Sequence, residues 1–340
     1  AASRKKRSTG YRRKRSLRQV GVPFDSHLHA LAAACGDDCN VGAHELDFAR
    51  ERGVARIHLR HRGAQVDDQV VDRLLPLGRV AFVDLADAVK RVERWLMRSA
   101  DGFVVVTEAA RGILFPESRD DGTDNQGRPV EVIPCCVDLS ERRFAIRSKI
   151  ARQGSGPVVT HVGALGGLYL TNEIVGLMTI AKLRDPSTFA LFLTKHLQEH
   201  VRQLMENAGF KNTDFVIRSV PPAEIADEIA ESFFGISLVI PSFSSKSRSP
   251  TKIPEYLAAG VPVISNSGVG DVDAMITENR VGVLLHELSD AAFDRALDEL
   301  EELYKEGGLR QRCRETSKRL FDLEEVGGVR YRRIYKALMN

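Results

Sequence analysis

From Val158 to Leu285, short apolar runs alternate with longer segments of helical periodicity, and this alternation leaves few folds open to the chain. Chains that alternate strands and helices join neighbouring strands by right-handed crossovers, which produce a parallel sheet. The runs are apolar at most positions, as expected for strands that helices cover on both faces. The expected strands are 158–162, 189–193, 215–217, 236–240, 261–264 and 281–285.

A similar but shorter series precedes this one, beginning at Arg56. The polar, turn-rich segment 116–129 within it is expected to be a surface loop. Two segments nearer the start, HLHALAAAC and HELDFARERG, have helical patterns. The earlier series predicts strands at 57–59, 80–83, 103–106 and 130–133, and helices at 65–75, 88–99 and 108–114.

The length of 340 residues suits two domains of common size. The two series predict two α/β lobes with a soft linker at 147–157, and the pattern after Ser289 is purely helical. We therefore predict an α/β fold with two Rossmann-like lobes, whose parallel sheets face a cleft, and a helical C-terminal tail. The expected divisions are a basic arm at 1–20, an incomplete N-terminal lobe at 21–146, a C-terminal lobe at 147–320 and a C-terminal helix at 321–340.

The basic arm holds nine Lys and Arg residues and no acid, although the whole chain carries a net charge of only +3. Such an arm can contact an anionic membrane or a nucleic acid through residues 4–18, or can stay solvated. Its single aromatic residue, Tyr11, disfavours nucleic acid, because single strands are bound by stacking on aromatic rings.

The composition predicts a cytoplasmic protein, and an arm that contacts lipid would place it at the inner membrane face. No apolar run approaches the ~20 residues that cross a bilayer, and no apolar segment of a secretory signal follows the arm. Five cysteines, an odd number that includes the adjacent Cys135 and Cys136, indicate reduced thiols. No metal site is predicted, because the cluster His27, His29, Cys35 and Cys39 matches no common zinc spacing.

The segment 240–265 carries the clearest ligand-binding pattern. Open α/β sheets bind ligands beyond the carboxyl ends of their strands, and here a strand leads into a polar loop and then a helix. Thr251 is expected to cap that helix, whose free amides would bind an anion. Lys246 and Lys252 add positive charge, so a diphosphate would be stabilised without a metal. Glu255 can accept hydrogen bonds from two ribose hydroxyls.

This segment, SRSPTKIPEYLAAGVPVI at 247–264, resembles the signature of the family-4 retaining glycosyltransferases of the GT-B fold, in the branch with SPTK-x-x-EYLA. Other segments resemble that family in the same order along the chain, and the resemblance covers about residues 55–340. It implies an enzyme of hexosyltransferase type that moves a sugar from a nucleoside-diphosphate sugar to an acceptor hydroxyl with retention, in polysaccharide assembly. These segments are ADGFVVVTE at 100–108, VIPCCVD at 132–138, HVGALGGLY at 161–169 and SGVGDVD at 267–273.

The resemblance implies that residues 147–320 bind the sugar donor and residues 21–146 the acceptor, a carbohydrate or lipid-linked carbohydrate. It implies that 331–338 packs back on the N-terminal lobe, and that the donor is bound without a metal or a further cofactor. Arg218 and Val220 are placed near the base only by their position after a strand. The candidate donor-binding residues are Gly163, Gly166, Gly167, Arg218, Val220, Lys246, Ser249, Thr251, Lys252 and Glu255.

Three departures from the family pattern bear on catalysis. Ser247 stands where many members carry Glu, and Ala164 stands where many carry Arg. A lysine at 195, 246 or 252 would then have to neutralise the leaving diphosphate. Asp84 lies nearest the place of a family His, where it either contacts the sugar or caps the next helix. The candidate catalytic residues are Asp84, Lys195 and Lys252.

Two further hypotheses remain open beside the transferase. The incomplete N-terminal lobe, Ser247 and Ala164 favour a relative that binds a nucleotide sugar without transferring it. A sugar-nucleotide epimerase shares the two-lobe fold, but the signature with Glu255 argues against it.

Overall fold

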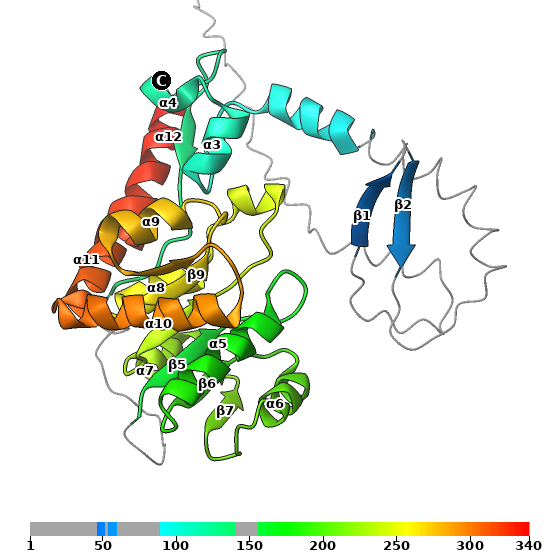
Figure 1. The fold of residues 1–340 in the computed structure, drawn as a ribbon. Coiled ribbons are helices and arrows are strands. Elements are labelled where there is room, and N and C mark those ends of the chain that lie inside the picture. The colour runs from blue at the N-terminus through cyan, green and yellow to red at the C-terminus, as the bar shows by residue number, and fades with distance from the viewer. Residues whose placement is uncertain (1–45, 52–53, 60–86, 88, 141–155, 340) are drawn as a thin grey trace, which may run out of the picture. The chain divides into compact units, whose positions relative to one another are not determined.

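The fold is described here from a computed structural model of the chain (Figure 1). The structure describes residues 46–51, 54–59, 87, 89–140 and 156–339. The chain divides into two compact units, residues 1–65 and 66–340. Several predictions lie outside the described residues, among them the arm 1–20, the segment HLHALAAAC, the helix 65–75 and the strand 80–83.

The first unit contains a β-hairpin where the sequence predicts a helix followed by a parallel strand. Strand β1 (Leu46–Glu51) pairs antiparallel with strand β2 (Val54–Leu59), from Leu46 opposite Leu59 to Glu51 opposite Val54. The helical prediction for HELDFARERG is therefore wrong, and β2 has no parallel partner among the described residues. Pairing with a neighbouring strand outweighs the helix propensity of Ala, Arg and Glu, and helical periodicity does not reveal such pairing.

The second unit is built on a parallel sheet of six strands. Their spatial order is β10-β9-β8-β5-β6-β7, so the direction of winding reverses between β5 and β8. This is the strand order of a Rossmann-like sheet, and it confirms the lobe predicted for this half of the chain. The strands are β5 (Val158–Val162), β6 (Phe189–Leu193), β7 (Phe215–Arg218), β8 (Phe234–Ser237), β9 (Val263–Asn266) and β10 (Gly282–Leu285).

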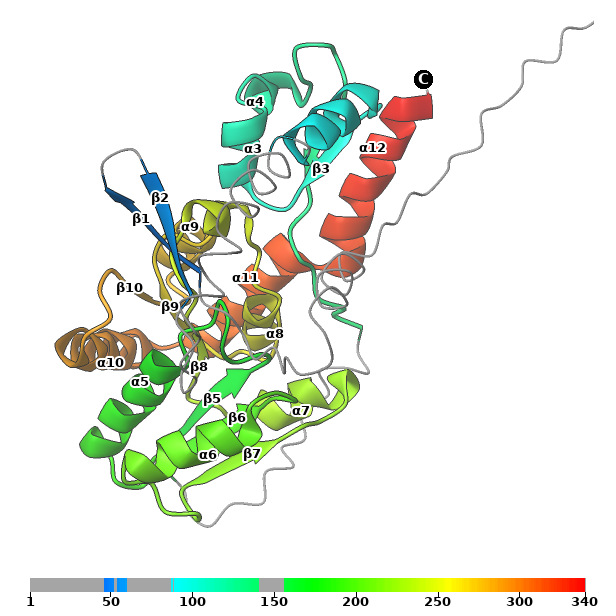
Figure 2. The same cartoon turned by 90° about the vertical axis from the view of Figure 1, so that its right-hand side faces the viewer.

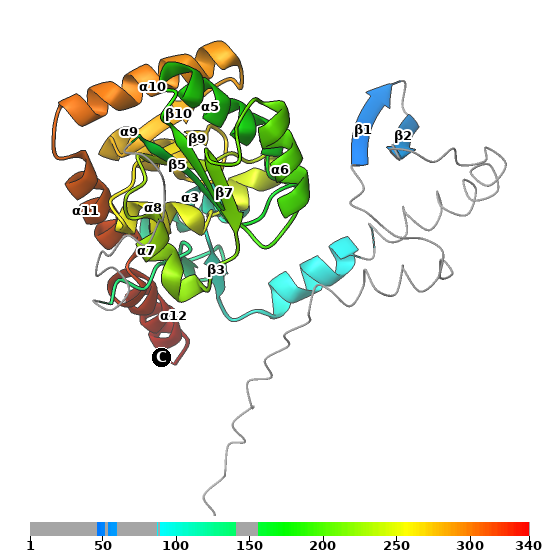
Figure 3. The same cartoon turned by 90° about the horizontal axis from the view of Figure 1, so that it is seen from below.

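Helices cover both faces of this sheet, which explains its continuously apolar strands (Figure 3). Helices α5, α6 and α10 lie on one face, and α7, α8 and α11 lie on the other. Every residue of β5 and β6 is buried. The helices of this half are α5 (Thr171–Arg184), α6 (Gln198–Asn207), α7 (Ile225–Ile229), α8 (Lys252–Ala258), α9 (Val272–Asn279), α10 (Asp290–Lys305) and α11 (Leu309–Phe321), with the 3-10 turns η1 (Pro222–Glu224) and η2 (Phe243–Ser247).

Strand β8 differs most from its prediction, because it begins two residues earlier and ends at Ser237 instead of Ile240. Beyond Ser237 the amide of Val239 donates to the side-chain oxygen of Asn266 (2.8 Å), and the Asn266 amide group donates back to the Val239 carbonyl (2.9 Å). A side chain therefore takes the place of a neighbouring strand, which an apolar run in the sequence cannot show.

Residues 89–140 form a smaller parallel segment in which β3 (Phe103–Val105) pairs with β4 (Val130–Val132). Between these strands lie α3 (Glu108–Leu114) and α4 (Ser118–Asp121), so the predicted surface loop contains a helical turn. After α11, the π-helical turn η3 (Leu323–Gly328) leads into α12 (Val329–Met339). Helix α12 packs against β4, where Arg330 donates to the Val132 carbonyl at 2.6 Å (Figure 2).

Tyr256 of α8 binds strands β5 and β8 of the large sheet, at the point where the strand order reverses. Its ring lies against Gly235, where a Cβ atom would come within 2.6 Å of the ring. Its hydroxyl accepts a hydrogen bond from the Val162 amide (2.8 Å) and donates to the Thr160 carbonyl (3.2 Å). Burial raises the pKa of Tyr256, so the hydroxyl stays protonated and keeps donating. The tyrosine of the EYLA motif therefore serves the fold and fixes the position of its neighbour Glu255.

Candidate functional site

The candidate site lies at the carboxyl ends of β5 and β8, where the strand order reverses and where open α/β sheets bind ligands. Strand β5 leads into the glycine loop 163–167, and β8 leads through η2 to α8. Gly163 has a φ of +101°, a backbone conformation that favours glycine. A Cβ atom at Gly163 would lie only 3.8 Å from Lys252 Nζ, so the lysine of α8 reaches the glycine loop of the other strand.

Lys252 is a buried cation that lacks a hydrogen-bond acceptor within the described part of the chain. The residue is 5% exposed, and its ammonium lies 4.1 Å from the centroid of the Tyr169 ring. That cation–π contact compensates only part of the cost of removing the charge from water. Burial lowers the pKa of Lys252 to about 7, and the carboxylate of Glu255 opposes that shift. The geometry therefore favours an anionic ligand at this ammonium.

His161, in β5, ties the glycine loop to the sheet. Its Nε2 atom lies 3.1 Å from the Ala164 carbonyl oxygen, which assigns the ring proton to Nε2. Burial and, after it, the charge of Lys252 lower the pKa of His161 well below its ordinary value. The imidazole is therefore neutral, so it holds the loop without offering a second positive charge to an anion.

A cavity of about 210 Å³, here called the donor-edge cavity, opens at the carboxyl ends of β5, β6 and β7. Three of the candidate residues line it, namely Gly163, Lys195 and Val220. Apolar walls with a few polar groups suit a planar ring with hydrogen-bonding edges. The remaining lining residues are Val162, Ala164, Leu193, Thr194, His196, Ser219, Pro222 and Ile225.

Four other candidate residues occupy the same edge of the sheet. Arg218 directs its guanidinium to Glu228 of α7, a nearly buried carboxylate, so its charge is already paired. Glu255 is half-buried and is close enough to Lys252 to act on its pKa. Gly166 donates its amide to the Thr171 hydroxyl (2.8 Å). Gly166 and Gly167 both have positive φ, as the turn requires, but they do not line the donor-edge cavity.

The loop before α8 differs from its prediction because Thr251 does not cap the helix and because the helix dipole is weak. Thr251 stands at the N-cap position, but its side chain makes no capping hydrogen bond, because its backbone is already helical there (φ −60°, ψ −28°). The helix that follows has only seven residues, so its dipole adds little to the full charge of Lys252. Ser249 accepts a hydrogen bond from the Cys135 amide (3.0 Å), and the exposed Lys246 accepts one at its carbonyl from Thr107 (2.7 Å).

Asp84, the third catalytic candidate, lies outside the described residues. His161 and Tyr169 belong to the site although the sequence assigned them no role. Both belong to the segment HVGALGGLY. The glycine loop in this segment carries no charged residue, which indicates that a cation from another part of the chain must reach the ligand. Among the residues that the structure describes, no cluster of three or more His, Cys, Asp or Glu side chains is placed to hold a metal ion.

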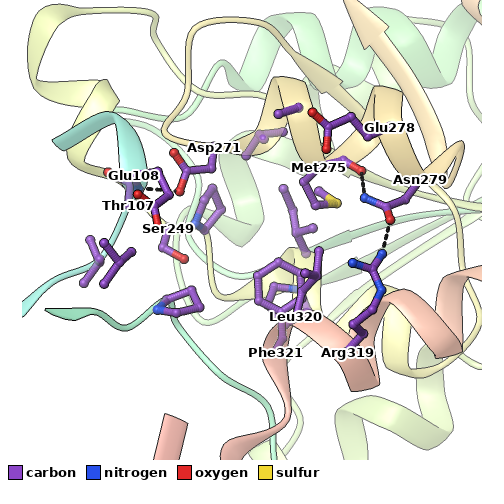
Figure 4. A pocket seen from close by; sticks show the side chains of 18 of the residues that line it. Thr107, Glu108, Ser249, Asp271, Met275, Glu278, Asn279, Arg319, Leu320 and Phe321 are labelled. Atoms are coloured by element: carbon purple, nitrogen blue, oxygen red, sulfur yellow. Dashed lines mark hydrogen bonds between the residues drawn. The ribbon is translucent and has the colours of Figure 1, made fainter. Parts of the chain in front are cut away.

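A second, larger cavity of about 380 Å³, here called the junction cavity, lies between the β3–β4 segment and helices α8, α9 and α11 (Figure 4). Its walls are mostly apolar, with Met275, Leu320 and Phe321 among them. Three of its charged side chains are hydrogen-bonded within the protein: Asp271 accepts from two amides of α3, Arg319 donates to the neutral Asn279 side chain, and Arg330 donates to the Val132 carbonyl.

Taken together, a Rossmann-like lobe, a second parallel segment and a returning C-terminal helix give the GT-B-like α/β fold that the sequence predicts. No family model and no curated protein matches the sequence significantly. None of the helices in the described ranges is both long enough and apolar enough to cross a membrane.

Comparison with solved structures finds glycosyltransferases at low sequence identity. A glycosyltransferase from Rickettsia africae matches with a TM-score of 0.53 and 16% identity over 71% of this chain and 64% of its own. Sucrose-phosphate synthase from Thermosynechococcus elongatus matches with 0.50 and 16% over 73% and 61%. The pneumococcal O-GlcNAc transferase GtfA, in complex with UDP and GlcNAc, matches with 0.50 and 13% over 71% and 46%. The chain thus spans from about half to under two thirds of these proteins, and the likeness is one of fold.

Proposed function

We propose that this chain is a glycosyltransferase that takes a sugar from a nucleoside diphosphate and transfers it to an acceptor hydroxyl. One observation carries the proposal: the buried ammonium of Lys252 faces the glycine loop at the reversal point of the sheet and has no acceptor among the described residues. The donor-edge cavity opens beside it. The proposal is supported by the fold shared with GtfA, which was solved with UDP and GlcNAc.

In this proposal the donor lies across the carboxyl ends of β5 and β8. The base enters the donor-edge cavity near Val220, and Glu255 accepts hydrogen bonds from the ribose hydroxyls. Lys252 neutralises the diphosphate, and Gly163 allows the phosphates to approach the backbone. Lys195, on the rim of the cavity, is the second cation available to the leaving group. Arg218 acts indirectly, by holding α7 through Glu228.

The reaction breaks the bond between the anomeric carbon and the diphosphate oxygen, and it forms a bond from that carbon to the acceptor oxygen. The electron pair of the broken bond stays on the diphosphate, where Lys252 stabilises the developing charge. The acceptor proton passes to the leaving phosphate. The sugar keeps its anomeric configuration because the acceptor attacks the face from which the diphosphate departs. The products are a glycoside and a nucleoside diphosphate, and no cofactor or metal takes part.

The acceptor and the location of this activity are also proposals. A carbohydrate or lipid-linked carbohydrate is the acceptor class, as expected for an enzyme of polysaccharide assembly. Catalysis would take place in the cytoplasm, with residues 4–18 at an anionic membrane face, and Asp84 remains a candidate on the acceptor side.

The proposal is tested by titrating the full chain with UDP, GDP, ADP and the matching nucleosides in a calorimeter. One diphosphate is expected to bind at least tenfold more tightly than its nucleoside. Glu255→Gln should weaken binding of that nucleotide about tenfold, because the ribose contact loses its charge. Binding of inorganic pyrophosphate should change less, because Glu255 acts on it only through the pKa of Lys252. A chain that binds none of the six ligands would contradict the proposal.

A binding protein without transfer is the second candidate, and Ser247 favours it. Its hydroxyl donates to the Ser244 carbonyl (2.9 Å) in an exposed turn, at the place where many members of the resembled family carry Glu. Incubation with the matching sugar nucleotide separates the two candidates. Release of nucleoside diphosphate upon addition of acceptor glycans supports transfer, whereas tight binding without any release supports the binding protein.

A further inference from the structure

Helix α3, in the N-terminal part of the second unit, is capped by a residue from the donor side of the chain. The Asp271 carboxylate accepts hydrogen bonds from the amides of Glu108 (2.7 Å) and Ala109 (2.9 Å) (Figure 4). Thr107 completes the cap by accepting from the Ala110 amide (3.0 Å). Asp271 also stands at the N-cap of its own helix α9, yet its side chain makes no capping bond there. It serves a helix 163 positions away instead.

The same threonine holds the loop that leads to Lys252. The hydroxyl of Thr107, a residue only 1% exposed, donates to the Lys246 carbonyl at 2.7 Å. Three positions further, Ser249 accepts from the Cys135 amide at 3.0 Å. The segment 246–249 is therefore tied at both ends to the β3–β4 segment, and Lys252 follows it after two residues.

Gly270 shows how closely these parts approach. A Cβ atom there would lie 2.1 Å from the Arg248 carbonyl oxygen and 2.9 Å from the Thr107 methyl group. The Gly270 amide donates to the Ser245 carbonyl (2.9 Å), which joins the loop after β9 to the loop after β8. Three segments of the chain thus meet at one glycine, and the space between them leaves no room for a side chain there.

From these contacts we infer that Thr107 and Asp271 are positioning residues, which hold the 243–251 loop so that Lys252 faces the glycine loop. Neither side chain lines the donor-edge cavity. Thr107 acts on the backbone of the loop directly, through the Lys246 carbonyl. Asp271 acts on it indirectly: it holds its own loop against α3, and the amide of its neighbour Gly270 donates to the Ser245 carbonyl. The identity of the ligand in this inference rests on the proposed function, whereas the position of the loop does not.

The experiment compares Thr107→Val, which keeps the shape and loses both hydroxyl bonds, with Thr107→Ser, which keeps both. Hydrogen exchange of the loop amides 243–251 is measured by mass spectrometry in the full chain. Thr107→Val should accelerate exchange about five- to tenfold, and Thr107→Ser should stay within twofold of the wild type. Thr277→Val is the control, since its hydroxyl bonds only to carbonyls within α9.

Ligand binding gives the second readout, with inorganic pyrophosphate and the nucleoside of the best diphosphate as probes. Thr107→Val and Asp271→Asn should each lower the affinity for pyrophosphate about five- to tenfold. The affinity for the nucleoside should stay within twofold of the wild type, because the donor-edge cavity does not touch the loop. A variant that only destabilises the lobe would lower the affinity for both probes together. Unchanged loop exchange in Thr107→Val overturns the inference, whereas a wild type that binds no phosphate ligand overturns the proposed function.

Discussion

The donor-edge cavity and the junction cavity differ in size and in electrostatics. Size favours the junction cavity as the ligand site, whereas electrostatics favours the donor-edge cavity. The junction cavity is the larger, at about 380 Å³ against about 210 Å³. Asp271 in its wall accepts from two amides and Arg319 donates to Asn279, so both side chains already have hydrogen-bond partners within the protein. Beside the smaller cavity, Lys252 is buried with no hydrogen-bond acceptor that the described residues supply.

This difference teaches that an unsatisfied buried charge locates a site better than volume does. An apolar hollow whose polar side chains are hydrogen-bonded within the protein is stable when empty. A buried ammonium without an acceptor has a free-energy cost that an anion removes, so the protein gains stability when a diphosphate binds. The predictions that follow test whether binding follows the charge or the volume.

The largest effect is expected from Lys252→Met, which keeps an unbranched side chain of nearly the same length and removes the charge. Diphosphate affinity should fall about 100-fold, or ~2–3 kcal/mol, because a charged contact in a dry site is lost. The matching nucleoside should bind as before, as measured by calorimetry. In the absence of ligand the variant should be more stable by about 1–3 kcal/mol, since the buried charge is gone. Equal losses for the nucleoside and the diphosphate would rule out a phosphate contact.

A pH dependence of intermediate size should accompany the same contact. Burial lowers the pKa of Lys252 to about 7, and a bound diphosphate should raise it again by supplying the missing partner. Lys252 is then protonated in the complex but increasingly neutral in the free protein as pH rises above 7. Binding takes up a proton in that range, so affinity should fall by up to tenfold per pH unit from pH 7 to 9.

The measurement uses calorimetry in two buffers of different ionisation enthalpy, which counts the protons taken up. The nucleotide itself contributes little above pH 7, because the second pKa of a phosphate ester is about 6. Lys252→Met is expected to lose the dependence. Proton uptake that persists in this variant would assign the titration to another group.

The smallest effect is expected in the junction cavity. Ala274 is exposed at its wall in α9, so Ala274→Trp can fill part of the space without disturbing the core. Nucleotide affinity should change less than twofold, because the two arginines in this cavity, Arg319 and Arg330, already have hydrogen-bond acceptors within the protein. A tenfold loss would instead place the ligand, or a coupled step, in the larger cavity.

Much of the donor half could be predicted from the sequence, because its signals are local. Strands β5 and β6 and helix α3 have the predicted bounds, since apolar runs and helical periodicity mark them directly. Lys252 and Gly163 were both named as candidates. The hairpin β1–β2 was missed, because strand pairing is a contact between segments and helix propensity is not.

The sequence by itself determined the winding of the large sheet and the kinds of residue at its ligand edge. Alternating strands and helices have one favoured handedness, and the SPTK-x-x-EYLA segment must follow a strand. Only the tertiary structure decided which charges are satisfied. Arg218 and Lys252 are both cations near strand ends, yet Arg218 meets Glu228, whereas Lys252 meets an aromatic ring. Asp271 caps a distant helix instead of its own. Folding brings distant residues together and so decides which charged side chains have a partner, and the spacing of residues along the sequence does not reveal these contacts.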